Sequence, residues 1–134
     1  MSVRKRLLAL AGVAMSVVLI GTGVSPAAAV TSAPFSGTAS STFNWSSSGA
    51  DYWNDDPGDD FGFDNTSGIA IDGRWANCLL TKNGATHYDI YGSGQGRVTL
   101  GTGFLTLSCL KLQFRGYSTT GNFSGTVYFN QSWA

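Results

Sequence analysis

The chain has 134 residues, which is enough for one domain, and its eight acidic residues are all Asp. Ser, Thr, Gly, Asn and aromatic residues dominate, a composition that favours strands and turns over helices. Eight Lys and Arg balance the eight Asp, but they form no cluster outside the N-terminus. This distribution excludes the basic footprint of a nucleic-acid-binding protein.

The N-terminus has the pattern of a secretory signal peptide. Basic residues at 4–6 precede an apolar run at 7–20, and three Ala at 27–29 supply small residues for signal peptidase. We expect a signal peptide over residues 1–29 and a secreted, extracellular domain over 30–134. An uncleaved membrane anchor is the alternative, but the apolar core is shorter than the ~20 residues that cross a bilayer. Cleavage leaves five basic against eight acidic residues, a net charge of −3.

The first predicted strand covers Phe35–Trp45, where apolar and small residues alternate with polar ones. A loop with turn chemistry at Asp56-Pro57-Gly58 then leads to a very short strand at 61–63. A better strand follows at 68–71, and Asp72-Gly73 is a dipeptide typical of hairpin turns.

The second half of the chain predicts further short strands. Residues 75–81 form one, and Asn83-Gly84 is the strongest hairpin signal in the sequence. The long apolar stretch Phe104–Phe114 changes its alternation near Ser108, which predicts a bulge or a switch of sheets. The last strand covers 123–133, and its resemblance in pattern to the first suggests that the two terminal strands pair.

The two Cys, Cys78 and Cys109, allow a single disulfide. An even number of Cys in a secreted chain is usually paired, whereas two buried free thiols are the alternative. About eight short strands separated by turns predict an all-β fold, an antiparallel β-sandwich of jelly-roll or Greek-key type.

Seven of the eight Asp lie within residues 51–72. Calcium takes six to eight oxygen ligands, which Asp carboxylates on a turn-rich loop can supply. The predicted metal ligands are Asp55, Asp56, Asp59, Asp60 and Asp64. The spacing does not match an EF-hand, and a solvated acidic turn without any ion is the alternative.

Four aromatic residues are interleaved with these carboxylates. Rings that stack on a sugar face, next to acids that accept bonds from its hydroxyls, are typical of carbohydrate recognition. The predicted ligand-binding residues are Tyr52, Trp53, Phe61 and Asp51. The alternative is that the rings of Phe61 and Phe63 cover the edge of the core.

The only His, His87, lies two residues before Asp89, on the same face if the segment is a strand. The sequence contains no Gly-x-Ser-x-Gly motif that would supply a serine nucleophile, and it has no Glu. We therefore expect no catalytic residue.

These observations predict a secreted, monomeric and non-enzymatic module that binds a polysaccharide through an acidic, aromatic loop, with calcium as the candidate cofactor. A secreted inhibitor or other module that binds an extracellular protein is the first alternative. A small secreted hydrolase is the second.

Overall fold

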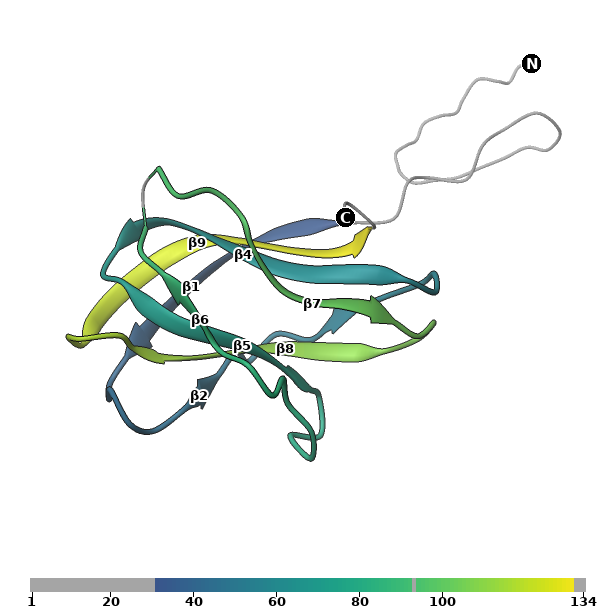
Figure 1. Cartoon of the computed structure of the whole chain (residues 1–134), viewed down its shortest axis with the longest axis horizontal. Coiled ribbons are helices and arrows are strands. Elements are labelled where there is room, and N and C mark those ends of the chain that lie inside the picture. The colour runs from purple at the N-terminus through teal and green to yellow at the C-terminus, as the bar shows by residue number, and fades with distance from the viewer. Residues whose placement is uncertain (1–30, 93, 132–134) are drawn as a thin grey trace, which may run out of the picture.

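A computed structural model describes residues 31–92 and 94–131. The predicted signal peptide at 1–29 lies outside these residues. Two antiparallel sheets pack face to face, so the predicted sandwich is confirmed (Figure 1). The first sheet contains β1 (Ser32–Ala39), β9 (Gly121–Gln131), β4 (Asp59–Gly68) and β7 (Val98–Phe104), in that order. Over the described residues there is no helix with the length and apolar character to span a membrane.

The second sheet contains β2 (Ser46–Ser47), β8 (Cys109–Gly116), β5 (Ile71–Asn77) and β6 (Tyr88–Ile90), in that order. A further short strand, β3 (Tyr52–Trp53), pairs with β8 opposite Leu110 and Cys109. Because β5 occupies one edge of β8, β2 and β3 share the other edge. The first and last strands pair along their length, from Ser32 opposite Tyr128 to Ala39 opposite Gly121, as predicted.

The core lies between the sheets and is rich in Phe. In β8, Leu110, Leu112 and Phe114 are buried while the residues between them are less so, which confirms the predicted alternation. The Phe114 and Phe123 rings meet edge to face with centroids 4.9 Å apart, the arrangement that aromatic quadrupoles favour.

Cys78 and Cys109 form the predicted disulfide, with Cα atoms 5.4 Å apart. It ties the end of β5 to the start of β8 across a sequence separation of 31. A closed loop of this length stabilises the folded state by about 3.5 kcal/mol in the chain-entropy model.

Two predicted elements near the N-terminus differ in the structure. The first strand ends at Ala39 rather than Trp45, and Phe43, which the alternation placed with the core residues, is exposed. The short strand predicted at 61–63 is part of the ten-residue β4. Alternation alone did not reveal β4 because its buried residues include Asp59 and Asp60.

The predictions of hairpin turns at two dipeptides are both wrong. Asp72-Gly73 lies inside β5, paired with strands on both sides. Asn83 forms a bridge with Ala76, and the connection turns instead at Leu80, whose φ is 58°. The side chain of Asn77 stabilises this turn, because its Oδ1 accepts bonds from the backbone N–H of Thr81 and Lys82 at 2.8 and 3.0 Å.

The change of alternation near Ser108 marks a switch of sheets rather than a bulge, because β7 belongs to the first sheet and β8 to the second. β7 ends at Phe104, a tight turn follows, and β8 begins at Cys109. In this turn Ser108 donates its backbone N–H to the carbonyl of Leu105 at 3.1 Å, and Leu107 has a φ of 64°. Its leucines are therefore exposed, whereas the alternation suggested that they continue a strand.

Candidate functional site

Residues 51–64, which we call the acidic stretch, contain four aromatic residues, and the structure buries some of these and exposes others. Tyr52 is buried, and Phe61 is 0% exposed. Their ring centroids lie 5.8 Å apart in the core. The alternative that Phe61 and Phe63 belong to the core is confirmed, since neither reaches the surface. Neither Tyr52 nor Phe61 presents a ring face that a sugar at the surface could stack upon, because β3 and β4 turn these side chains inward.

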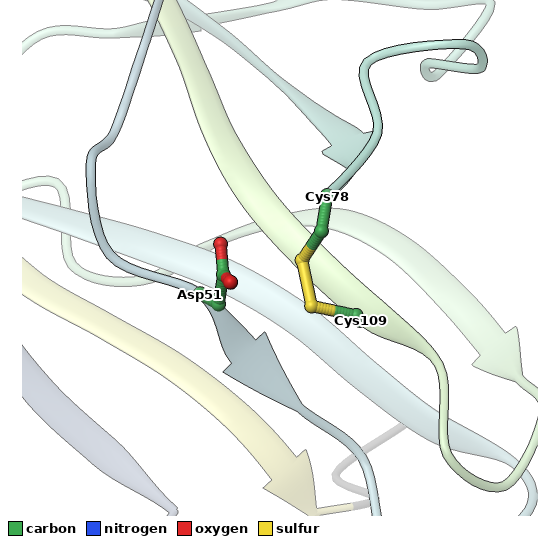
Figure 2. A group of neighbouring side chains, drawn as sticks. All are labelled: Asp51, Cys78 and Cys109. Carbon is green, nitrogen blue, oxygen red and sulfur yellow. A yellow bond between two sulfur atoms is a disulfide. The ribbon is translucent and has the colours of Figure 1, made fainter.

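Trp53 and Asp51 remain at the surface, on either side of Tyr52. Trp53 is 51% exposed, and Asp51 forms an ion pair with Lys111, with Oδ1 and Nζ 2.7 Å apart. Figure 2 shows Asp51 beside the disulfide. Its carboxylate and the two sulfur atoms lie within 4.8 Å of one another, but sulfurs joined in a disulfide are not thiolate ligands, so this group is not a metal site.

The five carboxylates predicted to bind calcium do not converge. Asp59 and Asp64 are five residues apart along β4, a distance of about 17 Å in an extended strand. Asp55 is engaged by Asn130, whose Oδ1 accepts its backbone N–H at 2.7 Å and whose Nδ2 donates to its Oδ2 at 3.1 Å. Among the described residues, no three of the five Asp bring ligand atoms within 4.8 Å of one another.

Asp59 differs from the other members of this set. Its Oδ2 is buried and has no hydrogen-bond donor. Burial raises the pKa of its carboxyl above the ordinary value, and the charges of Asp56, Asp60 and Asp55 add to this, while a bond from the Asp56 backbone opposes it. Asp59 is therefore a buried carboxyl group with one unsatisfied oxygen, at the first residue of β4.

A second group of acidic and aromatic side chains lies on the outer face of the second sheet. Asp72 on β5 and Asp89 on β6 are register partners, so both side chains stand on this face. His87 comes from the segment before β6, and its Nδ1 lies 3.7 Å from Oδ2 of Asp72. The ligand atoms of the three residues all lie within 4.8 Å of one another.

Asp72 is the buried centre of this group. Its Oδ2 accepts a hydrogen bond from Nε of Arg115 at 3.1 Å, but its buried Oδ1 has no donor. Burial raises the pKa of Asp72, contact with the Asp89 carboxyl raises it further, and the bond from Arg115 opposes both. The site thus holds two adjacent carboxyl groups with one guanidinium paired to the buried one.

Trp45 closes one side of the group. The guanidinium carbons of Arg74 and Arg115 lie 4.0 and 4.5 Å from the centroid of its ring, which is cation–π contact. The ring of His87 meets Trp45 edge-on, with centroids 5.8 Å apart. Arg74 also donates from Nε to Oε1 of Gln113 at 2.8 Å. Trp45 and its partners therefore fix the positions of both guanidiniums and of the imidazole.

Two exposed tyrosines lie next to Asp89 in this group. Tyr91 is 56% exposed and Tyr117 is 42% exposed, and their ring centroids lie 5.5 Å apart. The hydroxyl of Tyr91 donates to Oδ2 of Asp89 at 3.3 Å. A hydrogen bond with Tyr117 and the charge of Asp89 raise the pKa of Tyr91 to about 12, so its hydroxyl remains a neutral donor at physiological pH. We call the set Trp45, Asp72, Arg74, His87, Asp89, Tyr91, Arg115 and Tyr117 the outer-face site.

The outer-face site is not apparent from the sequence, because its members come from four separated segments. The spacing of His87 and Asp89 indicates only that the two side chains share one face of a strand. The position of Arg115 in β8, next to the buried Phe114 and therefore on the opposite face, is a partial signal of the site. The pairing of Asp72 with Asp89 is not apparent from the sequence, because Asp72-Gly73 is typical of a turn, whereas in the structure it lies within β5.

A separate cluster of exposed apolar side chains surrounds the disulfide. Leu79 and Leu80 follow Cys78, Leu105 and Leu107 precede Cys109, and Trp53 is the register partner of Cys109. A cleft of about 330 Å³ lies between the two turns, with lining residues that include Trp75, Phe104, Leu105 and Leu110. We call the five exposed residues the leucine end.

The chain matches no protein-family model, no curated protein and no solved structure.

Proposed function

We propose that the protein is a non-enzymatic carbohydrate-binding module that acts outside the cell and binds its saccharide on the outer-face site. The observation that carries this proposal is the exposed pair of Tyr91 and Tyr117 next to the carboxyl group of Asp89. This is the combination of ring faces and acids that the sequence suggested for residues 51–64, located instead on the second sheet.

Each part of the outer-face site suits one part of a sugar. The tyrosine rings offer apolar faces for the C–H face of a pyranose, and their hydroxyls remain hydrogen-bonding groups. Asp89 accepts bonds from sugar hydroxyls, and the guanidinium of Arg74 donates them. Arg74 has no carboxylate partner within the described residues, so it is also available to an acidic sugar.

The same geometry argues against a glycosidase. Inverting and retaining enzymes separate their two carboxyl groups by about 6.5–9.5 Å and 5–5.5 Å respectively. The carboxyl groups of Asp72 and Asp89 are in direct contact, which is closer than either arrangement. Within the described residues, no hydroxyl group is hydrogen-bonded to the imidazole of His87, so a serine nucleophile is not in place beside it.

The test is a glycan array with the purified secreted protein, followed by titration of the best saccharide into variants. We expect Tyr91→Ala and Tyr117→Ala each to weaken binding by about tenfold, the loss of one stacking contact. Trp53→Ala is the matched control, an exposed aromatic outside the outer-face site, and should bind normally. Loss of binding in Trp53→Ala with normal binding in both tyrosine variants would contradict this proposal and would place the saccharide site at the acidic stretch instead.

A second candidate function is the binding of an extracellular protein at the leucine end. Leu80 and Leu107 both have left-handed backbone conformations, which cost about 1–2 kcal/mol each for a residue with a Cβ. Strain that presents two leucines to solvent, beside an apolar cleft, favours an apolar contact with a partner.

The charges nearby favour a protein over an anionic lipid surface. Asn54 is bonded to both Leu107 and Ser108, which places the exposed Asp55 and Asp56 beside the same turn. The test is inhibition of a panel of secreted hydrolases by the purified protein. Leu80→Ser with Leu107→Ser should abolish any inhibition, whereas Tyr91→Ala should retain it.

A further inference from the structure

The outer-face site contains three donors that a metal ion could share. One carboxylate oxygen each from Asp72 and Asp89 and one imidazole nitrogen of His87 lie within 4.8 Å of one another. A zinc ion 2.0–2.2 Å from such atoms holds its ligands about 3–3.5 Å apart. The 3.7 Å between Nδ1 of His87 and Oδ2 of Asp72 is close to this, and Oδ2 also accepts the bond from Arg115.

A second observation points to a missing cation. Asp72 is 6% exposed, and its buried Oδ1 has no hydrogen-bond donor. Arg115 occupies Oδ2 only, and Tyr91 donates to Asp89 without neutralising it. Two carboxyl groups therefore face each other with one guanidinium paired to Asp72, which leaves the buried Oδ1 of Asp72 without a partner.

The neighbouring groups suit a metal site. Trp45 contacts both His87 and the guanidinium of Arg115, and therefore holds the imidazole and the paired arginine in place. Tyr91 holds Asp89 in the same way. Partners of this kind orient ligands and commonly accompany metal centres. Arg74 and Arg115 are the cationic groups that oppose an ion at this position.

From these contacts we infer that Asp72, His87 and Asp89 bind a divalent transition-metal ion, with zinc the principal candidate. One imidazole and two carboxylates suit zinc and related ions, whereas calcium requires six to eight oxygens. Three protein ligands leave coordination positions open to a further ligand. This second part rests on the proposed function: the open positions take a pair of neighbouring hydroxyls of the bound saccharide.

The metal is tested first, without any saccharide. Zinc chloride is titrated calorimetrically into the EDTA-stripped secreted protein, free of any histidine tag, and we expect one ion per chain. Because His87 is the only His, His87→Ala removes the only imidazole. His87→Ala and Asp89→Asn should each weaken zinc binding by about 100-fold. Asp56→Asn, an exposed carboxylate in the acidic stretch, is the matched control and should bind zinc normally.

Zinc binding that is absent from the unaltered protein, or equal in His87→Ala, would overturn the metal site. Thermal melts of each variant establish that it is folded. Saccharide binding is then compared in zinc and in EDTA, with at least tenfold weaker binding expected in EDTA. Equal binding in both overturns the bridging role and leaves the module standing, whereas zinc binding without any saccharide binding overturns the proposed function alone.

Discussion

The acidic stretch and the outer-face site contain the same kinds of side chain, but the fold treats them in opposite ways. Residues 51–64 are adjacent in sequence, yet β3 and β4 bury Tyr52 and Phe61, and the carboxylates are divided between β4 and the loop before it. The outer-face site comes from four segments between Trp45 and Tyr117, and strand pairing brings them into contact.

This difference shows that side chains close together in the sequence need not lie close together in a β-sandwich. An extended strand carries neighbouring residues about 3.4 Å apart per step and turns them to alternate faces, so a dense cluster in sequence is dispersed. Register between strands is what gathers side chains, and it acts on residues that are far apart in the chain. Asp72 and Asp89 are 17 positions apart and directly opposed.

The largest effect on stability should come from truncating a buried aromatic residue of residues 51–64, compared with truncating an exposed one. Phe61→Ala should lower the free energy of unfolding by about 3–5 kcal/mol, because it leaves a cavity in the core. Trp53→Ala should lower it by about 1 kcal/mol or less, since half of its surface is exposed. Urea denaturation measures both, and equal losses would mean that the stretch packs differently.

A smaller effect concerns the buried carboxyl group of Asp59. Burial raises its pKa in the folded state above the ordinary value of 3.8, so the folded protein holds this proton more tightly than the unfolded chain. Its contribution to stability is therefore present below about pH 4 and is lost as pH rises through the folded pKa. Asp59→Asn should gain stability relative to the unaltered protein between pH 4 and pH 7, measured in EDTA.

The matched control for this effect is Asp56→Asn, which removes an exposed carboxylate from the same turn. Its stability should follow that of the unaltered protein across the same pH range. If the stability of Asp59→Asn also followed that of the unaltered protein across this pH range, the carboxyl group of Asp59 would have to be solvated in the folded state.

The smallest effect should be that of calcium on the acidic stretch. Because its five Asp do not converge, calcium, magnesium and sodium chloride at equal ionic strength should raise the melting temperature by the same small amount through screening. A bound ion would instead stabilise by about 2.7 kcal/mol at one hundred times its Kd. A gain specific to calcium, reduced in Asp59→Asn, would show that residues 54–60 close around the ion.

The sequence by itself determined the features that depend on composition and short-range pattern. A composition that favours strands, together with short strand patterns separated by turn residues, predicted the sandwich, and two Cys allowed one disulfide. The alternation of Leu110, Leu112 and Phe114 identified the inner face of β8, because each side chain of a strand faces opposite to its neighbour.

Only the tertiary structure decided where the chain turns and which polar groups meet. Leu80 and Leu107 turn the chain in left-handed conformations that leucine rarely adopts, so no dipeptide signal marks them. Asp72 meets Asp89, His87 and Arg115 because β5 lies between β6 and β8. That order follows from burying one apolar face of each strand in a common core, a long-range requirement that no short stretch of sequence contains.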